Sequence, residues 1–268
     1  MEIARARNDT LSNLWVHRAL VLLCLIVLAI RPPWSPRILL ALSLTGLYLK
    51  FDDAFLVGLT SALWLLLRTV AIINRLWIYT PLALIGGLTV WTLVIRYSGG
   101  GRYPVVAKGS LAWVRKGDWG RSQIAIAVVI AVLSALALVL WYFIVKPDIT
   151  DIWARIRNVH PVLLIAAGVF WSIINATGEE FLWRGMIFDA LERTITPSAA
   201  VISIQALSFG AAHFHGFPRG ASGMVLASIY GFMLGYLRKQ ANGLLAPIVA
   251  HVFADITIFL IVASTLLP

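Results

Sequence analysis

Ionisable side chains in the carboxy-terminal half of the chain lie in or beside uncharged, apolar runs. Three of them belong to segment 178–184 (GEEFLWR), which follows the seventeen-residue uncharged run Pro161–Thr177. Ionisable groups at membrane depth are costly, and they usually face a protein interior or a water-filled cavity and have a function there. The candidate site residues are Glu179, Glu180, Arg184, His213, His251 and Asp255.

The spacing of the first three groups predicts different roles for two adjacent carboxylates. On a helix, Glu180 and Arg184 are four residues apart, so their side chains share a face and can pair. Glu179 is rotated from Glu180 by about 100°, because a helical turn takes 3.6 residues. It therefore has no partner on its own helix. A desolvated carboxylate without a local partner suits the role of a general base.

The other candidate groups lie on two further apolar segments. His251 and Asp255 are four residues apart in the last apolar run, and Phe209 precedes His213 by the same interval. Taken singly, each motif has a structural explanation: an ion pair, a helix-end histidine satisfied by backbone, or a local hydrogen-bonded pair. Because all three fall in one half of the chain, we expect them to meet at a shared interior point.

Together the motifs resemble those of the CPBP intramembrane proteases, which include the CAAX prenyl proteases and the bacterial Abi proteins. The stretch Glu179–Asp189 (EEFLWRGMIFD) is the most specific part, and the resemblance covers roughly residues 123–267. The resemblance implies that the protein is an intramembrane endopeptidase. The motifs occur in the family's order, as Glu179-Glu180-x-x-x-Arg184, Phe209-x-x-x-His213 and His251-x-x-x-Asp255.

The resemblance also implies roles for individual residues. Glu179 would activate the hydrolytic water, and His213 would help to hold that water. Glu180, held by Arg184, would support the site. His251 with the last residue of its motif would position the substrate carbonyl and stabilise the oxyanion.

Asp255 departs from the commonest form of the family's last motif, which often ends in Asn. A neutral amide can donate a hydrogen bond to an oxyanion, whereas an ionised carboxylate cannot. Asp255 would have to be protonated, orient His251, or bind a metal.

The family has been described both as glutamate-dependent and as metal-dependent, and the sequence leaves both mechanisms open. Glu179, His213 and His251 are a possible zinc ligand set with an open fourth position for water. Equally, a desolvated glutamate and two histidines suffice for general-base and oxyanion roles without a metal. The predicted cofactor is therefore none or a divalent metal such as Zn2+.

The composition predicts the elements that must position these groups. The chain has 268 residues, of which 60% are hydrophobic and 13% charged, whereas soluble domains are about 45–50% apolar and about 25% charged. This composition therefore predicts a polytopic membrane protein. We expect it to be all-α, because open sheets cannot cross lipid and the sequence has no alternating pattern of a β-barrel. The single cysteine, Cys24, excludes a disulfide framework.

About nine spans (eight to nine) are expected, since a span needs about 20 apolar residues. Two of them fit between Arg37 and Ile73, split near Lys50–Asp53. A short interfacial amphipathic helix is expected within Asp148–His160. The remaining candidate spans are Leu14–Ile30, Leu76–Ile95, Gln123–Val145, Pro161–Thr177, Pro197–Phe214, Ala221–Leu237 and Leu244–Leu267.

Basic residues predict the orientation and the partners. The segment Arg96–Arg121 holds six basic residues against one acid, which places it and the amino terminus in the cytoplasm and the carboxyl terminus outside. The net charge is +10, and the basic residues lie in short gaps between apolar runs. This placement indicates topology signals and contacts with lipid headgroups, and it argues against nucleic-acid binding. Expected partners are membrane lipids and a membrane-associated or lipidated peptide or protein substrate.

We expect a multi-pass protein of the bacterial inner (plasma) membrane with two regions. Residues 1–121 would form an amino-terminal four-helix membrane region that includes the basic loop 96–121, and residues 122–268 a CPBP/Abi-like protease domain. Trp183 would shield the Glu180–Arg184 pair, line the substrate path, or pack against lipid.

Two other functions remain open at this stage. One is a catalytically silent membrane scaffold or immunity protein of the same fold. The other is a proton-coupled transporter, because Glu, His and Asp inside a bundle also suit a proton relay. Transporters usually have repeated halves with broken helices, and the sequence shows no such repeat. It also has no zincin or nucleophile-elbow motif.

Overall fold

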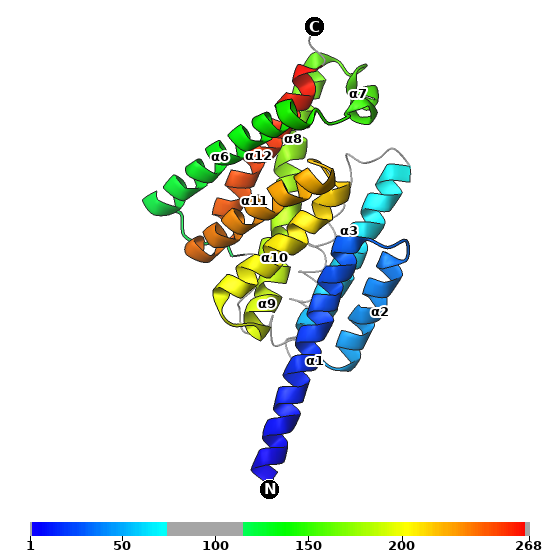
Figure 1. Cartoon of the computed structure of the whole chain (residues 1–268), viewed down its shortest axis with the longest axis vertical. Coiled ribbons are helices and arrows are strands. Elements are labelled where there is room, and N and C mark those ends of the chain that lie inside the picture. Colours follow the sequence, from blue (N-terminus) through cyan, green and yellow to red (C-terminus); the bar gives the residue numbers. More distant parts are fainter. Residues whose placement is uncertain (1, 74–114, 266–268) are drawn as a thin grey trace.

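The computed structural model describes residues 2–73 and 115–265, and within these ranges every regular element is a helix (Figure 1). Near the amino terminus, α1 (Glu2–Ile30), α2 (Ser35–Tyr48) and α3 (Asp52–Ile73) pack side by side. The predicted break near Lys50–Asp53 is confirmed, because a tight turn separates α2 from α3 there. The all-helical prediction holds for the described residues.

The carboxy-terminal part of the chain carries all the candidate site residues. Its longer helices, α6, α8, α11 and α12, form the frame into which the shorter elements fit. In order, the elements are α6 (Arg121–Val145), α7 (Thr150–Ile156), α8 (Pro161–Glu180), a π-helix (Phe181–Ile187), α9 (Phe188–Thr194), α10 (Ser198–Ala212), a 3-10 turn (His213–His215), α11 (Gly220–Ala241) and α12 (Leu245–Ser264).

Five described helical segments are long and apolar enough to cross a membrane, so the structure supports an integral membrane protein. The total of nine spans and the orientation stay predictions. The expected span Leu76–Ile95 and most of the basic loop lie outside the described residues. The five segments are Asn13–Ile30, Arg121–Val145, Pro161–Thr194, Gly220–Ala241 and Leu245–Ser264.

Two expected boundaries need correction. The helix predicted over Pro161–Thr177 does not end at its first charges, because it continues without a break to Thr194. The expected span Pro197–Phe214 is reduced to the 15 residues of α10, fewer than the roughly 20 that cross a bilayer. The short helix expected within Asp148–His160 is present as the seven-residue α7, and its position at the membrane interface stays a prediction.

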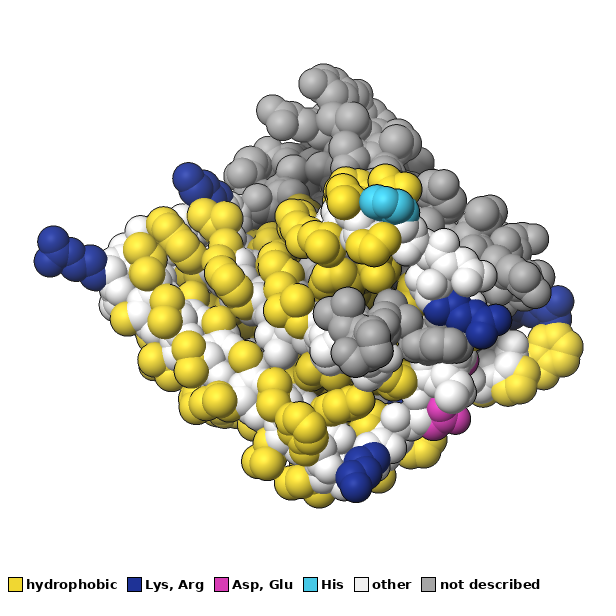
Figure 2. Space-filling view, turned by 90° about the horizontal axis from the view of Figure 1, so that it is seen from above, with side chains coloured by type: hydrophobic (Ala, Val, Ile, Leu, Met, Phe, Trp, Pro, Cys, Tyr) yellow, Lys and Arg dark blue, Asp and Glu magenta, His cyan; other side chains and the backbone are white. Residues whose placement is uncertain are grey.

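The exterior and the core are both apolar, as expected for a bundle in lipid. Hydrophobic side chains cover much of the described surface in Figure 2, and α6 and α8 expose many large ones. One hydrophobic core cluster joins α1 and α3 to the π-helix, α9 and α10. The amino-terminal helices therefore pack directly against the elements that carry the site. The division at residue 121 stays a prediction.

The segment before α6 fixes the turn that starts α12. Leu244 and Leu245 donate backbone hydrogen bonds to the carbonyls of Arg115 and Lys116. Gly117 has a φ of +82°, and a Cβ there would lie 2.4 Å from the Ala241 carbonyl oxygen, so this position requires glycine. Since α12 carries two candidate site residues, this turn helps to set their position.

Candidate active site

The two adjacent glutamates end α8, and a π-helix follows them directly. Single π turns inside α-helices occur frequently at functional sites. Arg184 lies in the π segment, and its backbone carbonyl accepts a hydrogen bond from Nε of Arg238 at 3.0 Å. Arg238 is buried, and its Nη2 also lies 3.5 Å from Oδ1 of Asp189. A buried cation from α11 therefore stabilises the irregular turn.

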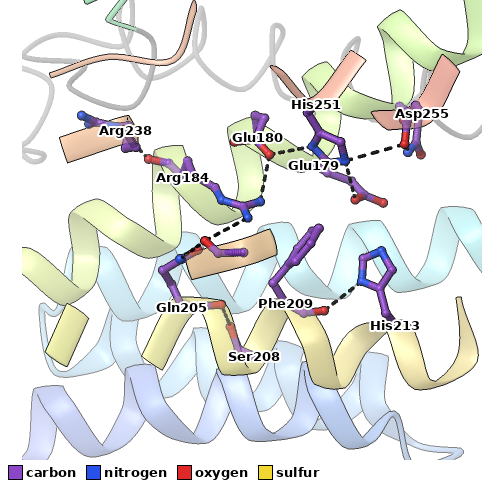
Figure 3. A network of polar contacts seen from close by, with 12 residues as sticks. Glu179, Glu180, Arg184, Gln205, Ser208, Phe209, His213, Arg238, His251 and Asp255 are labelled. Atoms are coloured by element: carbon purple, nitrogen blue, oxygen red, sulfur yellow. Dashed lines mark hydrogen bonds and ion pairs between the residues drawn. The ribbon is translucent and has the colours of Figure 1, made fainter. Parts of the chain in front are cut away.

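Glu180 joins two helices through one carboxylate oxygen (Figure 3). Arg184 Nη1 donates to Glu180 Oε1 at 2.8 Å, which is the pair predicted from the four-residue spacing, and both side chains are fully buried. His251 Nδ1 lies 2.7 Å from the same oxygen. The guanidinium also stacks 4.3 Å over the Phe209 ring and donates to the Gly231 carbonyl at 3.4 Å. These extra contacts are what a buried ion pair needs to offset its desolvation.

Glu179 faces a different set of groups. Its Oε2 is buried, and within the described part of the chain it has no hydrogen-bond partner. His251 of α12 is the cation-forming group that approaches it among the described residues, with Nε2 3.8 Å away. The carboxylate that the spacing left without a partner on its own helix is thus placed against a histidine from α12.

Asp255 is engaged as an acceptor. Asn175 Nδ2 donates to Asp255 Oδ2 at 3.0 Å, and His251 Nε2 lies 3.7 Å from Asp255 Oδ1. Sequence reasoning did not identify Asn175. A signal was present, because this amide stands one turn before Glu179 in the uncharged run Pro161–Thr177.

His213 stands at the end of α10, on the opposite side of the site from α8 (Figure 3). Its Nδ1 lies 2.9 Å from the Phe209 carbonyl oxygen, and the two rings are 4.4 Å apart between centroids. A carbonyl can only accept, so Nδ1 carries the proton and Nε2 is the basic nitrogen of the neutral ring. The histidine therefore caps its own helix, and the backbone fixes its tautomer.

One cavity of about 390 Å3 connects these groups. Trp183 lines it and is buried between Trp64 of α3 and Phe209, so packing against lipid is wrong for this residue. Arg31 and Arg219 also line the cavity. The four candidate residues that line it are Glu179, His213, His251 and Asp255.

The arrangement does not form a metal site. Across residues 2–73 and 115–265, no group of three or more His, Cys, Asp or Glu side chains is placed so that it could hold a metal ion. The possible ligand set Glu179, His213 and His251 is thus not gathered at ligand distance.

A comparison with protein families gives an independent result. Residues 161–257 match the type II CAAX prenyl endopeptidase Rce1-like family. This match confirms the resemblance to the CPBP proteases, and all six candidate residues lie within the matched segment. The Rce1-like family is a protease family, so the match supports a peptidase of the CAAX-protease type in a membrane. No curated protein and no solved structure matches the chain.

Proposed function

We propose that this protein is an intramembrane endopeptidase in which Glu179 activates the hydrolytic water. The observation that carries the proposal is the environment of the Glu179 carboxylate. Oε2 of Glu179 is buried without a hydrogen-bond partner in the described structure, next to a cavity that His213 and His251 share. A carboxylate held in this way is poised to accept a proton from a water molecule.

In the proposed reaction, Glu179 takes a proton from water while the water oxygen bonds to the scissile carbonyl carbon. The carbonyl oxygen becomes an oxyanion, which needs hydrogen-bond donors to stabilise it. Glu179 then returns the proton to the amide nitrogen, the C–N bond breaks, and an amine leaves. His213 is proposed to hold the attacking water from the opposite side of the cavity.

Glu180 and Arg184 are proposed as positioning residues. Because Glu180 Oε1 accepts from His251 Nδ1, it sets the rotation of the imidazole and directs Nε2 toward the cavity residues. Arg184 holds that carboxylate in place through its bond at 2.8 Å. His251 would then orient the substrate carbonyl.

The proposed substrate is a membrane-associated or lipidated peptide or protein. The apolar exterior would contact membrane lipids, and the cationic gaps between helices would contact their headgroups rather than nucleic acid. A bacterial plasma membrane is the proposed location.

The test is cleavage of an internally quenched peptide that carries a farnesylated cysteine near its carboxyl terminus, with the purified protein in detergent. Glu179→Ala and His213→Ala should each lower kcat/KM by about 10²- to 10⁴-fold, the usual contribution of a general base. Glu192→Ala is the matched control, because this carboxylate lies on α9 and pairs with Lys239. Wild-type rates in folded Glu179→Ala protein would contradict the proposal, and folded but inactive wild-type protein would favour the silent scaffold.

A further inference from the structure

The proposed reaction needs a hydrogen-bond donor for the oxyanion, and the last motif, His251 with Asp255, offers few such donors. Asp255 accepts from Asn175 and so uses one oxygen as an acceptor. His251 holds one proton toward Glu180, and its other nitrogen faces two carboxylates at 3.7 and 3.8 Å. A proton on that nitrogen would therefore have two carboxyl oxygens close by as acceptors. The last motif is thus rich in acceptors and poor in donors.

Tyr230 of α11 brings a donor to the same cavity. It lines the cavity together with Glu179, His251 and Asp255. Its ring stands edge-on to the His251 ring, with 5.5 Å between the centroids. Its hydroxyl is buried and has no hydrogen-bond partner among the described residues. A buried hydroxyl without a partner costs free energy, so such a group gains most from a ligand that accepts its proton.

We infer that Tyr230 is a further catalytic residue. Its hydroxyl donates a hydrogen bond to the substrate carbonyl and then to the oxyanion formed from that carbonyl. This inference rests on the proposed function. The O–H bond stays intact, because the hydroxyl donates and transfers no proton. Tyr230 thereby supplies the donor that Asn would supply at position 255.

Two tryptophan donors line the same cavity and serve as comparators. The Nε1 atoms of Trp64 and Trp183 are also buried without a partner in the described part of the chain. The two rings, however, pack edge-on against each other, and Trp183 packs in the same way against Phe209. Tyr230 is the one of the three whose ring contacts His251.

The test compares Tyr230→Phe with wild type on the same farnesylated peptide. Loss of one oxyanion donor typically lowers kcat by about 10²- to 10³-fold, and we expect a fall in this range with a change in KM below about threefold. The phenyl ring keeps the packing against His251, and thermal unfolding in detergent checks the fold. Tyr236→Phe is the matched control, because this tyrosine is exposed on the same helix. Trp64→Phe and Trp183→Phe should change kcat less than about tenfold.

A second variant separates a catalytic role from a structural one. Asp255→Asn places an amide donor in the motif, so Tyr230→Phe should cost less than about tenfold in that background. A loss equal to that in the Asp255 background would overturn the inference. So would a Tyr230→Phe enzyme that keeps more than half of the wild-type kcat while Glu179→Ala is inactive.

Binding of a phosphinate peptide, which mimics the tetrahedral oxyanion, gives a readout that does not need turnover. Tyr230→Phe should weaken this binding by the same factor as kcat, and equal binding by the two proteins would overturn the inference. If the wild-type protein neither cleaves the peptide nor binds the phosphinate, both the inference and the proposed function fail.

Discussion

Oε1 of Glu180 receives hydrogen bonds from two directions, Arg184 on its own helix and His251 on α12. Arg184 in turn reaches the Gly231 carbonyl on α11. One buried oxygen and its two partners thus hold three helices in register. At the scale of single residues, the geometry of the site depends on Glu180 Oε1 more than on any other atom, because this oxygen sets the rotation of the His251 ring.

Arg184→Met tests this dependence. The substitution leaves the Glu180 carboxylate buried without its cation, so we expect a loss of about 3–5 kcal/mol in the free energy of unfolding. Equilibrium unfolding in mixed detergent micelles measures it. Adding Glu180→Gln removes the uncompensated charge and should restore much of the stability. The double variant should remain poorly active, since the amide no longer holds His251 as the carboxylate does. An Arg184→Met protein as stable as wild type would contradict this account.

The sequence was sufficient for contacts within one helix and insufficient for contacts between helices. The Glu180–Arg184 pair follows from a spacing of four residues, and it is present at 2.8 Å. The bond from His251 to Glu180 spans 71 residues, and spacing does not say how α12 is rotated against α8. For the same reason Tyr230 was not singled out, because its importance comes from a contact with His251 that only packing creates.

At the scale of elements, the π-helix explains why the predicted boundary at Thr177 was too early. Charged residues were expected to end the apolar span, but Arg184 satisfies Glu180 inside the bundle and Arg238 satisfies the backbone carbonyl of Arg184. The helix therefore continues to Thr194. A pattern based on 3.6 residues per turn cannot detect a π turn, because the extra residue shifts every later side chain.

The end of α10 has a similar local cause. The His213 ring donates to the Phe209 carbonyl, which lies in the last turn of the helix. A side-chain donor therefore satisfies one of the carbonyls that a helix end leaves open. The proposed catalytic position of His213 coincides with its capping position, so α10 ends within the candidate site and is too short to span the bilayer.

Close packing of α10 on α11 makes Gly210, in the last turn of α10, a sensitive position. A Cβ at Gly210 would lie 1.8 Å from Ser228 Oγ and 2.6 Å from the Met224 carbonyl oxygen. Small residues allow such close approach of helices in membranes. Gly210→Ala should therefore lower the free energy of unfolding by about 1–3 kcal/mol, as overpacking does. It should also reduce peptide cleavage, because α10 carries His213.

Ser228→Ala supplies the control for this prediction. It removes the hydroxyl that the new methyl group meets but leaves the backbone carbonyl of Met224 in place. Added to Gly210→Ala, it should restore part of the lost stability and not all of it. Unfolding in detergent reports the stability, and a Gly210→Ala protein with wild-type stability and cleavage would contradict the packing account.

At the scale of the whole molecule, α11 runs from the end where the cavity residue Arg219 lies to the end that carries the basic turn with Arg238 and Lys239. Its 22 residues rise about 1.5 Å each, which gives about 33 Å, close to the thickness of a hydrocarbon core. Arg219 precedes the helix and lines the cavity, whereas Arg238 and Lys239 lie in its last turn. Figure 1 likewise shows the start of α1 and the end of α12 at opposite ends of the molecule. The cavity residues Arg31, Asp151 and Arg219 all belong to the end away from the basic turn.

The positive-inside rule then predicts the side from which the cavity is reached. If Lys239 faces the cytoplasm, Arg219 faces the opposite side, and a substrate would approach the cavity there. In a Cys24→Ser background, a membrane-impermeant maleimide applied to intact cells should label Arg219→Cys. Lys239→Cys should react only after the membrane is permeabilised. The parent protein with Cys24 is the control for background, because this thiol is buried. The reverse labelling pattern would invert the predicted topology and place the cavity mouth on the cytoplasmic side.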